Sequence, residues 1–443
     1  MRWRTSRHPI CHLRMFTGDQ TSIGYGPASG NPGNLRLRLF NVKYSPNLGD
    51  GLLSECLEGA LRDCGASEAS SIDLAGRTAY NAGSAARGRL VRFLQALPAP
   101  LRRQVVRIPL RRAAATKWVP HYLHETATCD AIIIGGGNLI SDLDLNFPTK
   151  LSLAIDIAAQ RGTPVYIYGV GVSDGWSKRG KALLHAALAK GVVQQVTARD
   201  ERSRVIWDNL AGERFSLPAR VVRDPGLLAV QRYAPPPRPQ RSPGTPGIIG
   251  LNIMSALAVT YHGGDAIAQD TLDSWYLDLA RNLVSRGWRL AIFSNGSPED
   301  REMVERLRPR FLALDVPDTA SPAPIEFPDV ATPQDLVASI AALDGLIAFR
   351  MHAIIAAYSC AVPFLALAWD RKLTSFVESV DCSDWYGDIK QIPPETGAER
   401  IIAAIAQGIP DNRRDAVVNE AREDVRRLYR SILAPSKGMN RQG

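Results

Sequence analysis

Two cationic side chains and an imidazole follow two consecutive apolar segments in the last third of the chain. Arg350 and His352 come directly after 345–349, and Lys372 comes after 363–369. Short apolar runs of this kind predict buried strands, and ligands of open α/β sheets bind at the carboxyl ends of such strands. Guanidinium groups and the free N–H groups of a helix start bind anions. The three residues therefore predict a site for a phosphate or a carboxylate.

Each of these residues, taken singly, could equally be a surface residue or a helix-capping partner. Apolar segments flank Arg350 and His352 on both sides, which argues against open solvent. We therefore favour the anion site when Arg350, His352 and Lys372 are considered as a group.

The first half of the chain places glycines and one more cation after predicted strands. The apolar run 131–134 ends in Gly135, Gly136, Gly137 and Asn138. Glycines allow the backbone to adopt positive φ and to approach a ligand closely. The segment is not a dinucleotide-binding fingerprint, because Ile140 stands where that motif needs glycine.

Arg199 follows the predicted strand 193–197, and we expect it to provide a second cationic contact. Asp200 and Ser203, next to it, are expected to cap and orient the following helix. Asp224, after 220–222 and before a proline, either faces the cleft or is a turn aspartate, and we assign it no catalytic role.

A polar loop precedes the predicted helix 52–64, and it contains Asn47, Gly49 and Asp50. Asn47 and Asp50 can cap this helix or contact a ligand, and both interpretations stay open. A strand, a tight loop and a helix in this order are typical of the start of a Rossmann-like domain.

The order of these motifs resembles the polysaccharide pyruvyl transferase family. The similarity lies in Arg-x-His-Ala at 350–353, a Val-Pro strand, and Asp-x-Lys at 370–372, with Met351 where the family usually has leucine. It extends over about 41–380, through further motifs at 47–50, 135–137, 199–203 and 224–227.

The resemblance implies an α/β fold of two Rossmann-like domains that face each other across a cleft, as in glycosyltransferases of the GT-B type. It also implies phosphoenolpyruvate as donor, a sugar or lipid-linked oligosaccharide as acceptor, and a cyclic ketal as product. No metal and no further cofactor are expected.

Arg199 and Arg350 are then expected to hold the donor phosphate and carboxylate, in either assignment, because planar guanidinium groups bind both anions. His352 is the expected general acid, protonating the enol methylene carbon or assisting phosphate departure. Arg350 should lower the pKa of His352 and a bound phosphate should raise it. The expected substrate-binding residues are Asn47, Gly49, Asp50, Gly135, Gly136, Gly137, Asn138 and Lys372.

The distribution of strands, helices and prolines predicts five segments. Residues 1–34 form a disordered leader, 35–232 a first Rossmann-like domain, 233–247 a linker with six prolines, 248–410 a second Rossmann-like, donor-binding domain, and 411–443 a terminal helix and tail. We expect the terminal helix to pack back onto the first domain.

Composition supports a globular cytoplasmic protein. The chain has 443 residues, 45% hydrophobic and 22% charged, and no apolar run approaches the ~20 residues that cross a bilayer. The six cysteines lack metal-ligand spacing, so we expect free thiols and no structural metal.

The net charge of +9 is concentrated in one segment. Residues 77–124 hold ten Lys and Arg and no Asp or Glu, and they have apolar residues at helical spacing. We interpret this basic helical segment either as a surface that docks on the anionic inner face of the plasma membrane or as a solvated excursion of the first domain. A nucleic acid is not the expected partner.

Two alternatives to pyruvyl transfer remain. One is a glycosyltransferase of the same architecture that uses a nucleotide sugar. The other is a non-catalytic protein that binds anionic surfaces, which would explain the basic segment but not the strand-end positions of Arg199, Arg350 and His352.

Overall fold

The computed structural model describes residues 34–80, 112–142, 144–238, 245–256, 267–314, 324–368 and 371–434. The predicted leader, except for its last residue, lies outside this range, as do 81–111 of the basic helical segment and 239–244 of the linker.

The first half of the chain forms a six-stranded parallel sheet in the order β2-β1-β3-β4-β5-β6. The strands are β1 Arg36–Asn41, β2 Glu68–Asp73, β3 Ala131–Gly135, β4 Val165–Val170, β5 Val193–Ala198 and β6 Ala219–Val221. The helices are α1 Leu48–Asp63, α4 Val119–Glu125, α5 Asn146–Arg161, α6 Lys178–Leu188, α7 Glu201–Trp207 and α8 Ala229–Tyr233, with short π-helical segments η1 Ala114–Trp118 and η2 Asp208–Gly212 and a 3-10 turn η3 Pro225–Leu228.

The second half forms another six-stranded parallel sheet, in the order β12-β11-β10-β7-β8-β9. Its strands are β7 Ile248–Asn252, β8 Arg289–Phe293, β9 Ile325–Glu326, β10 Gly345–Ala348, β11 Phe364–Leu367 and β12 Tyr386–Gly387. Its helices are α10 Gln269–Ser285, α11 Pro298–Leu312, α12 Pro333–Ala341, α13 Met351–Ser359, α14 Arg371–Ser379, α15 Pro394–Gln407 and α16 Asp411–Leu433, with a 3-10 turn η4 Ser383–Trp385.

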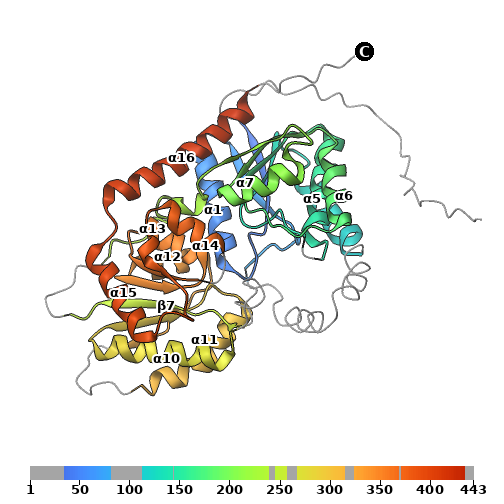
Figure 1. Ribbon diagram of the computed structural model, residues 1–443. Coiled ribbons are helices and arrows are strands. Elements are labelled where there is room, and N and C mark those ends of the chain that lie inside the picture. Colours follow the sequence, from blue (N-terminus) through green and yellow to red (C-terminus); the bar gives the residue numbers. More distant parts are fainter. Residues whose placement is uncertain are drawn as a thin grey trace, which may run out of the picture.

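Strands buried on both faces explain why the sequence shows apolar runs rather than alternation. All residues of β3, β4, β10 and β11 are buried, as parallel strands covered by helices require. Figure 1 shows the two lobes, with helices packed on both sides of each sheet. The predicted fold class, two Rossmann-like α/β domains, is confirmed.

The two domains pack closely along α1. This helix contacts α12 and α13 of the second domain, and one apolar core includes buried residues of both sheets. Backbone bonds cross as well: the N–H of Leu48 donates to the carbonyl of Asn295 at 2.7 Å. The side chain of Ser359, at the end of α13, donates to the carbonyl of Leu227 at 2.9 Å.

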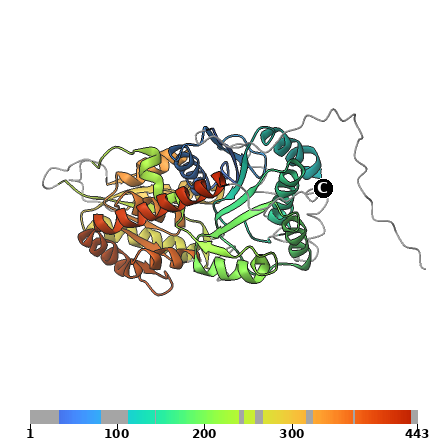
Figure 2. The ribbon, with the colours of Figure 1, turned by 90° about the horizontal axis from the view of Figure 1, so that it is seen from above.

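Helix α16 joins the domains a second time. In Figures 1 and 2 it runs from the second lobe across to the first. The N–H of Arg223 donates to Oδ2 of Asp424 at 2.8 Å, and Tyr166 Oη donates to the carbonyl of Ser431 at 3.2 Å. The expectation that the terminal helix packs back onto the first domain is confirmed.

In the part of the chain that is described, no helix is long and apolar enough to cross a membrane. The same residues contain no cluster of three or more His, Cys, Asp or Glu side chains arranged to hold a metal ion. Described cysteines, namely Cys56, Cys64, Cys129, Cys360 and Cys382, have free thiols.

Candidate functional site

The strand order of each sheet reverses next to the loops that carry the predicted site residues. In the first sheet the reversal lies between β1 and β3, which lead to Asn47 and to Gly137. In the second it lies between β7 and β10, which lead to Asn252 and to His352. Ligands of doubly wound sheets bind at such reversals, outside the carboxyl ends of the strands.

The start of α1 forms one wall of the site. Asn47 is the N-cap of this helix, and its Oδ1 accepts from the N–H of Gly49 at 3.2 Å, so its capping interpretation is confirmed. Gly49 lies directly under the imidazole, since a Cβ added there would be 2.7 Å from Cβ and 2.8 Å from Nδ1 of His352. Asp50 is half-buried, and burial raises the pKa of its carboxyl, while His352 opposes this shift.

The three glycines after β3 have different tasks. A Cβ on Gly135 would lie 3.0 Å from the carbonyl oxygen of Tyr168, and one on Gly136 only 1.9 Å from a methyl group of Leu53. These two glycines therefore let β3 pack against β4 and α1. Gly137, with φ of +69°, faces the site, where Oδ1 of Asp50 would lie 3.7 Å from an added Cβ.

Asn138 and Arg199 converge over Gly171, the residue after β4. A Cβ on Gly171 would come within 2.8 Å of Oδ1 of Asn138 and 2.9 Å of Nη2 of Arg199. Asn138 is oriented by a bond from Nδ2 to Oγ of Ser173 at 2.9 Å. The Arg199 side chain is 6% exposed, and its Nε lies 3.5 Å from Oδ2 of Asp200.

The interpretation of Asp200 and Ser203 as helix-capping and orienting residues is confirmed. Oδ1 of Asp200 accepts from the N–H of Ser203 at 2.7 Å and caps α7. Oγ of Ser203 accepts from the N–H of Val172 at 3.1 Å, which ties this helix start to the loop after β4. Arg199 is thus held between two fixed loops.

His352 reaches the first domain from the first turn of α13 and is 7% exposed. Nε2 of its imidazole has no hydrogen-bond partner among the described residues. Burial lowers its pKa to about 4; Asp50 opposes this shift and Arg199 reinforces it. The expectation that Arg350 lowers this pKa is wrong, because the arginine that does so is Arg199, from the other domain.

Arg350 lies at the predicted strand end but binds a carboxylate of its own domain. Its Nε is 3.0 Å from Oδ2 of Asp300, and Nη2 also donates to that oxygen. Oδ1 of Asp300 accepts from the N–H of Ser255 at 2.9 Å. Asp300 is 50 residues away in the sequence, and this buried ion pair was not predicted from the sequence.

Asp224 is the second residue whose environment the sequence did not reveal. It caps η3, with Oδ1 accepting from the N–H of Gly226 at 2.8 Å, and it is 6% exposed. Oδ2 points to the second domain and lies 3.8 Å from Nε2 of His352. Burial raises the pKa of Asp224 to about 6, against the charge of Arg199.

Several buried polar atoms around this point have no hydrogen-bond partner among the described residues. They are Oδ1 of Asn138, Nε of Arg199, Oδ2 of Asp224 and Nε2 of His352, with Oδ1 of Asn252 and Nδ2 of Asn295 nearby at the ends of β7 and β8. Buried polar groups are normally satisfied, so such a cluster indicates a ligand site. Both cationic and carboxyl groups face it, which suits an anion that also exchanges protons.

Lys372 lies in the first turn of α14, after β11, and is half-buried.

Of the predicted site residues, the structure brings these together at one place: Asn47, Gly49, Asp50, Gly137, Asn138, Arg199 and His352. Asp224 lies there as well, whereas Arg350 pairs with Asp300.

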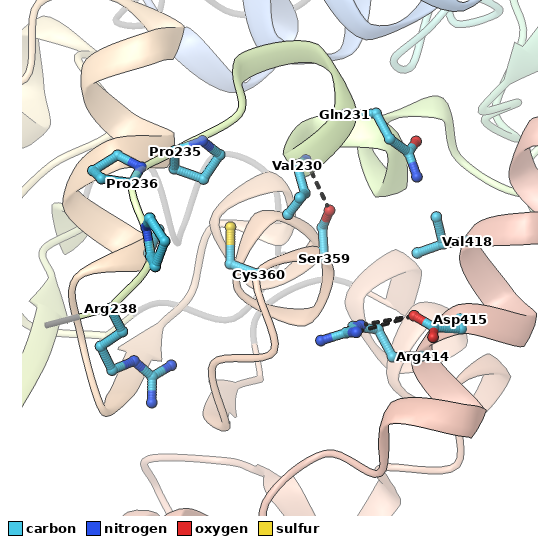
Figure 3. A pocket seen from close by; sticks show the side chains of 12 residues that line it. Val230, Gln231, Pro235, Pro236, Arg238, Ser359, Cys360, Arg414, Asp415 and Val418 are labelled. Carbon is cyan, nitrogen blue, oxygen red and sulfur yellow. Dashed lines mark hydrogen bonds and ion pairs between the residues drawn. The ribbon is translucent and has the colours of Figure 1, made fainter. Parts of the chain in front are cut away.

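A pocket of about 350 Å³ lies elsewhere, at the other end of α13 from His352 (Figure 3). Pro235 and Arg238 of the linker, Cys360 after α13, and Arg414 of α16 line it. Arg414 is paired with Asp415, and burial raises the pKa of the Cys360 thiol to about 12. None of the predicted site residues lines this pocket.

Comparison with known proteins agrees with the motifs and with the fold. The family described as "Polysaccharide pyruvyl transferase" matches residues 47–371. No curated protein matches the chain.

Solved structures resemble the chain at low identity. A putative UDP-N-acetylglucosamine 2-epimerase from Listeria monocytogenes has a TM-score of 0.52 at 10% identity, over 90% of this chain and 96% of that one. UDP-GlcNAc 2-epimerase from Methanocaldococcus jannaschii has a TM-score of 0.50 at 9% identity, over 90% and 99%. The glycotransferase of kitacinnamycin has a TM-score of 0.48 at 13% identity, over 92% and 100%. The similarity to the two epimerases concerns the two-domain α/β fold alone.

Proposed function

Because the chain belongs to the polysaccharide pyruvyl transferase family, we propose that it transfers the pyruvyl group of phosphoenolpyruvate to two hydroxyl groups of a sugar in a cell-surface or exopolysaccharide precursor. The product is a cyclic ketal. One observation carries the proposal. Nε of Arg199, after β5 of the first domain, and Nε2 of His352, after β10 of the second, are both buried without hydrogen-bond partners in the described structure.

Arg199 binds one anionic group of the donor. A guanidinium group suits either phosphate or carboxylate, because it presents several N–H donors in one plane. Lys372, which comes after β11 of the second domain, binds the other anionic group of the donor. Arg350 then has a positioning role, because its ion pair with Asp300 fixes the loop from which α13 and His352 start.

The reaction is acid–base chemistry on a small enol. A proton adds to the methylene carbon, and the adjacent carbon, now an oxocarbenium-like electrophile, is attacked by the first sugar hydroxyl, which loses its proton. The second hydroxyl displaces phosphate and its proton leaves with that group. His352 exchanges one of these protons with the reacting atoms, a task for which imidazole is the commonest side chain.

Family membership and charge support a proposal for the acceptor and for the location. We assign the acceptor to the sugars of lipid-linked or soluble polysaccharide precursors, and we place the enzyme at the inner face of the plasma membrane. The basic residues between 77 and 124 support that location at up to ~1 kcal/mol per residue near an anionic surface. Flotation with anionic vesicles that is lost at high salt is the expected result, and equal binding to neutral vesicles would reject it.

The test of the activity is turnover with a panel of glycosides. Purified protein is incubated with phosphoenolpyruvate, or with nucleotide sugars in a parallel series, and products are followed by mass and by phosphate release. Ketal formation only with phosphoenolpyruvate supports the proposal. Sugar transfer from a nucleotide sugar would favour the glycosyltransferase alternative, and no turnover with anionic-surface binding would favour the non-catalytic one.

A further inference from the structure

We propose that Asp224 is a catalytic residue: its carboxyl group donates the proton to the donor's methylene carbon, and His352 accepts the proton of the attacking sugar hydroxyl. This inference rests on the proposed pyruvyl transfer. The sequence suggests His352 as the general acid. Here His352 is the base instead, and the acid is Asp224, to which no catalytic role was assigned from the sequence.

The geometry places both groups at one point. Oδ2 of Asp224 and Nε2 of His352 are 3.8 Å apart, too far for a hydrogen bond to each other and near enough for a single small ligand to meet both. Each residue is at least nine-tenths buried, and neither of these two atoms has a hydrogen-bond partner among the described residues. Both atoms are therefore available to a bound reactant.

Oδ2 of Asp224 and Nε2 of His352 are the atoms that can meet a ligand, because the other polar atom of each side chain is occupied or covered. Oδ1 of Asp224 is occupied by the N–H of Gly226 at 2.8 Å. The other edge of the imidazole lies on Gly49, where even one added carbon would come within 2.8 Å of Nδ1. The carboxyl comes from the first domain and the imidazole from the second, so the pair exists only where the two domains meet.

The surroundings decide which member carries the proton. Burial raises the pKa of Asp224 to about 6 and lowers that of His352 to about 4, so the carboxyl holds the proton in preference to the imidazole. Burial thus reverses the ordinary order of the two pKa values, and neighbouring titratable groups with shifted pKa values are typical of an acid and a base. The charged and titratable groups that interact with the pair are Asp50 and Cys56 of α1, Tyr168 of β4, and Arg199 and Asp200 after β5.

Donor binding strengthens this assignment. The positive charge of Arg199 lowers the pKa of Asp224 in the free protein. When a donor anion neutralises that charge, the opposing influence disappears, and the anion itself raises the pKa further. Asp224 is then protonated near neutral pH, when a methylene carbon is there to receive the proton.

Asp224 loses one proton and His352 gains one in the first half of the proposed reaction. The O–H bond of Asp224 breaks as the new C–H bond forms, and the O–H bond of the sugar breaks as an N–H bond forms on His352. Transfer from Nε2 to Oδ2, directly or through solvent, restores the starting state. No oxidant, reductant or additional reactant takes part.

Asp224→Asn is the discriminating variant, because the amide keeps Oδ1 as acceptor for Gly226 and removes only the acidic proton. Turnover should fall by about 100- to 10,000-fold, while donor affinity stays near wild type and the melting temperature is no lower than that of the wild type. In the wild type, kcat should fall as pH rises through the pKa of Asp224 in the donor complex, and this limb should be absent from the variant. Asp208→Asn is the control: Asp208 accepts from the N–H of Ala219 at 2.9 Å, at the other end of β6, and its change should alter neither rate nor limb.

A fluorinated acceptor, whose attacking hydroxyl is more acidic, distinguishes acid from base. It should partly restore His352→Gln, which lacks the base, and leave Asp224→Asn slow. Restoration of Asp224→Asn alone would reverse the two roles and overturn the inference. If Asp224→Asn has the rate and the pH dependence of the wild type, the inference is overturned. The proposed function then still stands, provided that the wild-type protein forms the ketal. If the wild-type protein forms no ketal, both the inference and the proposed function are overturned.

Discussion

The guanidinium group of Arg350 donates two N–H groups to one oxygen of Asp300, with Nε at 3.0 Å, and both side chains lie inside the second domain. A strand-end arginine that the motif marks as a ligand contact therefore has a protein carboxylate as its first partner. The pair links the start of α11 to the start of α13 and so fixes the position of His352.

Arg350→Ala should therefore lower stability more than donor affinity. Removal of one member of a buried ion pair leaves an uncompensated charge and costs about 3–5 kcal/mol. Denaturant unfolding measures this loss, and Asp300→Asn in the same variant should recover part of it. Unchanged unfolding free energy together with much weaker donor binding would make Arg350 a direct donor ligand after all.

Arg199→Ala should have the opposite profile. Loss of a charge-assisted contact should weaken donor binding by ~1.5–3 kcal/mol, measured by calorimetry, with the fold intact. Arg202→Ala is the matched control, since Arg202 is exposed three residues further along and pairs with the exposed Asp174. Equal donor affinity in both variants would remove Arg199 from the binding site.

These two arginines show what the sequence could and could not predict. Apolar runs locate β3, β5, β6, β10 and β11 within one or two residues, and the glycine or cationic residues that follow β3, β5 and β10 lie at the edge of each sheet where the candidate site is. The residue type that comes after each strand is a local property of the sequence. It is therefore visible without coordinates.

Pairing between distant segments is not local. Arg350 meets a carboxylate 50 residues away, and His352 meets Gly49 and Asp224 only because α13 packs against α1 and η3 across the domain interface. The order of domains along the chain does not specify that contact. For the same reason Asp224 looks like an ordinary turn residue until its neighbours are known.

Gly49→Ala should slow turnover and leave donor binding nearly unchanged. The new methyl group would lie 2.7 Å from Cβ of His352, so the imidazole must shift away from Asp224. Gly59→Ala, in the same helix, is the control, because its methyl group would meet only the flexible side chain of Arg232. Alanine should be neutral or stabilising there. Similar turnover in the two variants would show that the contact between Gly49 and the imidazole of His352 has no effect on turnover.

The pH dependence of stability should reveal the two shifted groups separately. Asp224, with its pKa raised to about 6, binds more protons in the folded than in the unfolded protein, so its contribution to stability falls by about 3 kcal/mol as pH rises from 4 to 6. His352, lowered to about 4, acts with the opposite sign over about pH 4 to 6.5 and by a similar amount. The pKa of Asp50 is also raised, so its contribution to stability falls with rising pH as that of Asp224 does.

In the wild type these contributions largely cancel. Relative to the wild type, Asp224→Asn should therefore become more stable, and His352→Gln less stable, as pH rises from 4 to 6. Urea unfolding at several pH values measures both differences. Parallel curves for all three proteins would contradict the pKa shifts and with them the shared environment of the pair.

The most direct test of pyruvyl transfer is a single reaction in D2O with phosphoenolpyruvate and a glycoside acceptor, followed by mass spectrometry and NMR of the sugar product. We predict one phosphate released per ketal formed and one solvent deuterium in the ketal methyl group, because the methylene carbon takes a proton from the enzyme. Phosphate release without a ketal, or a ketal methyl group without solvent deuterium, would contradict the proposed transfer.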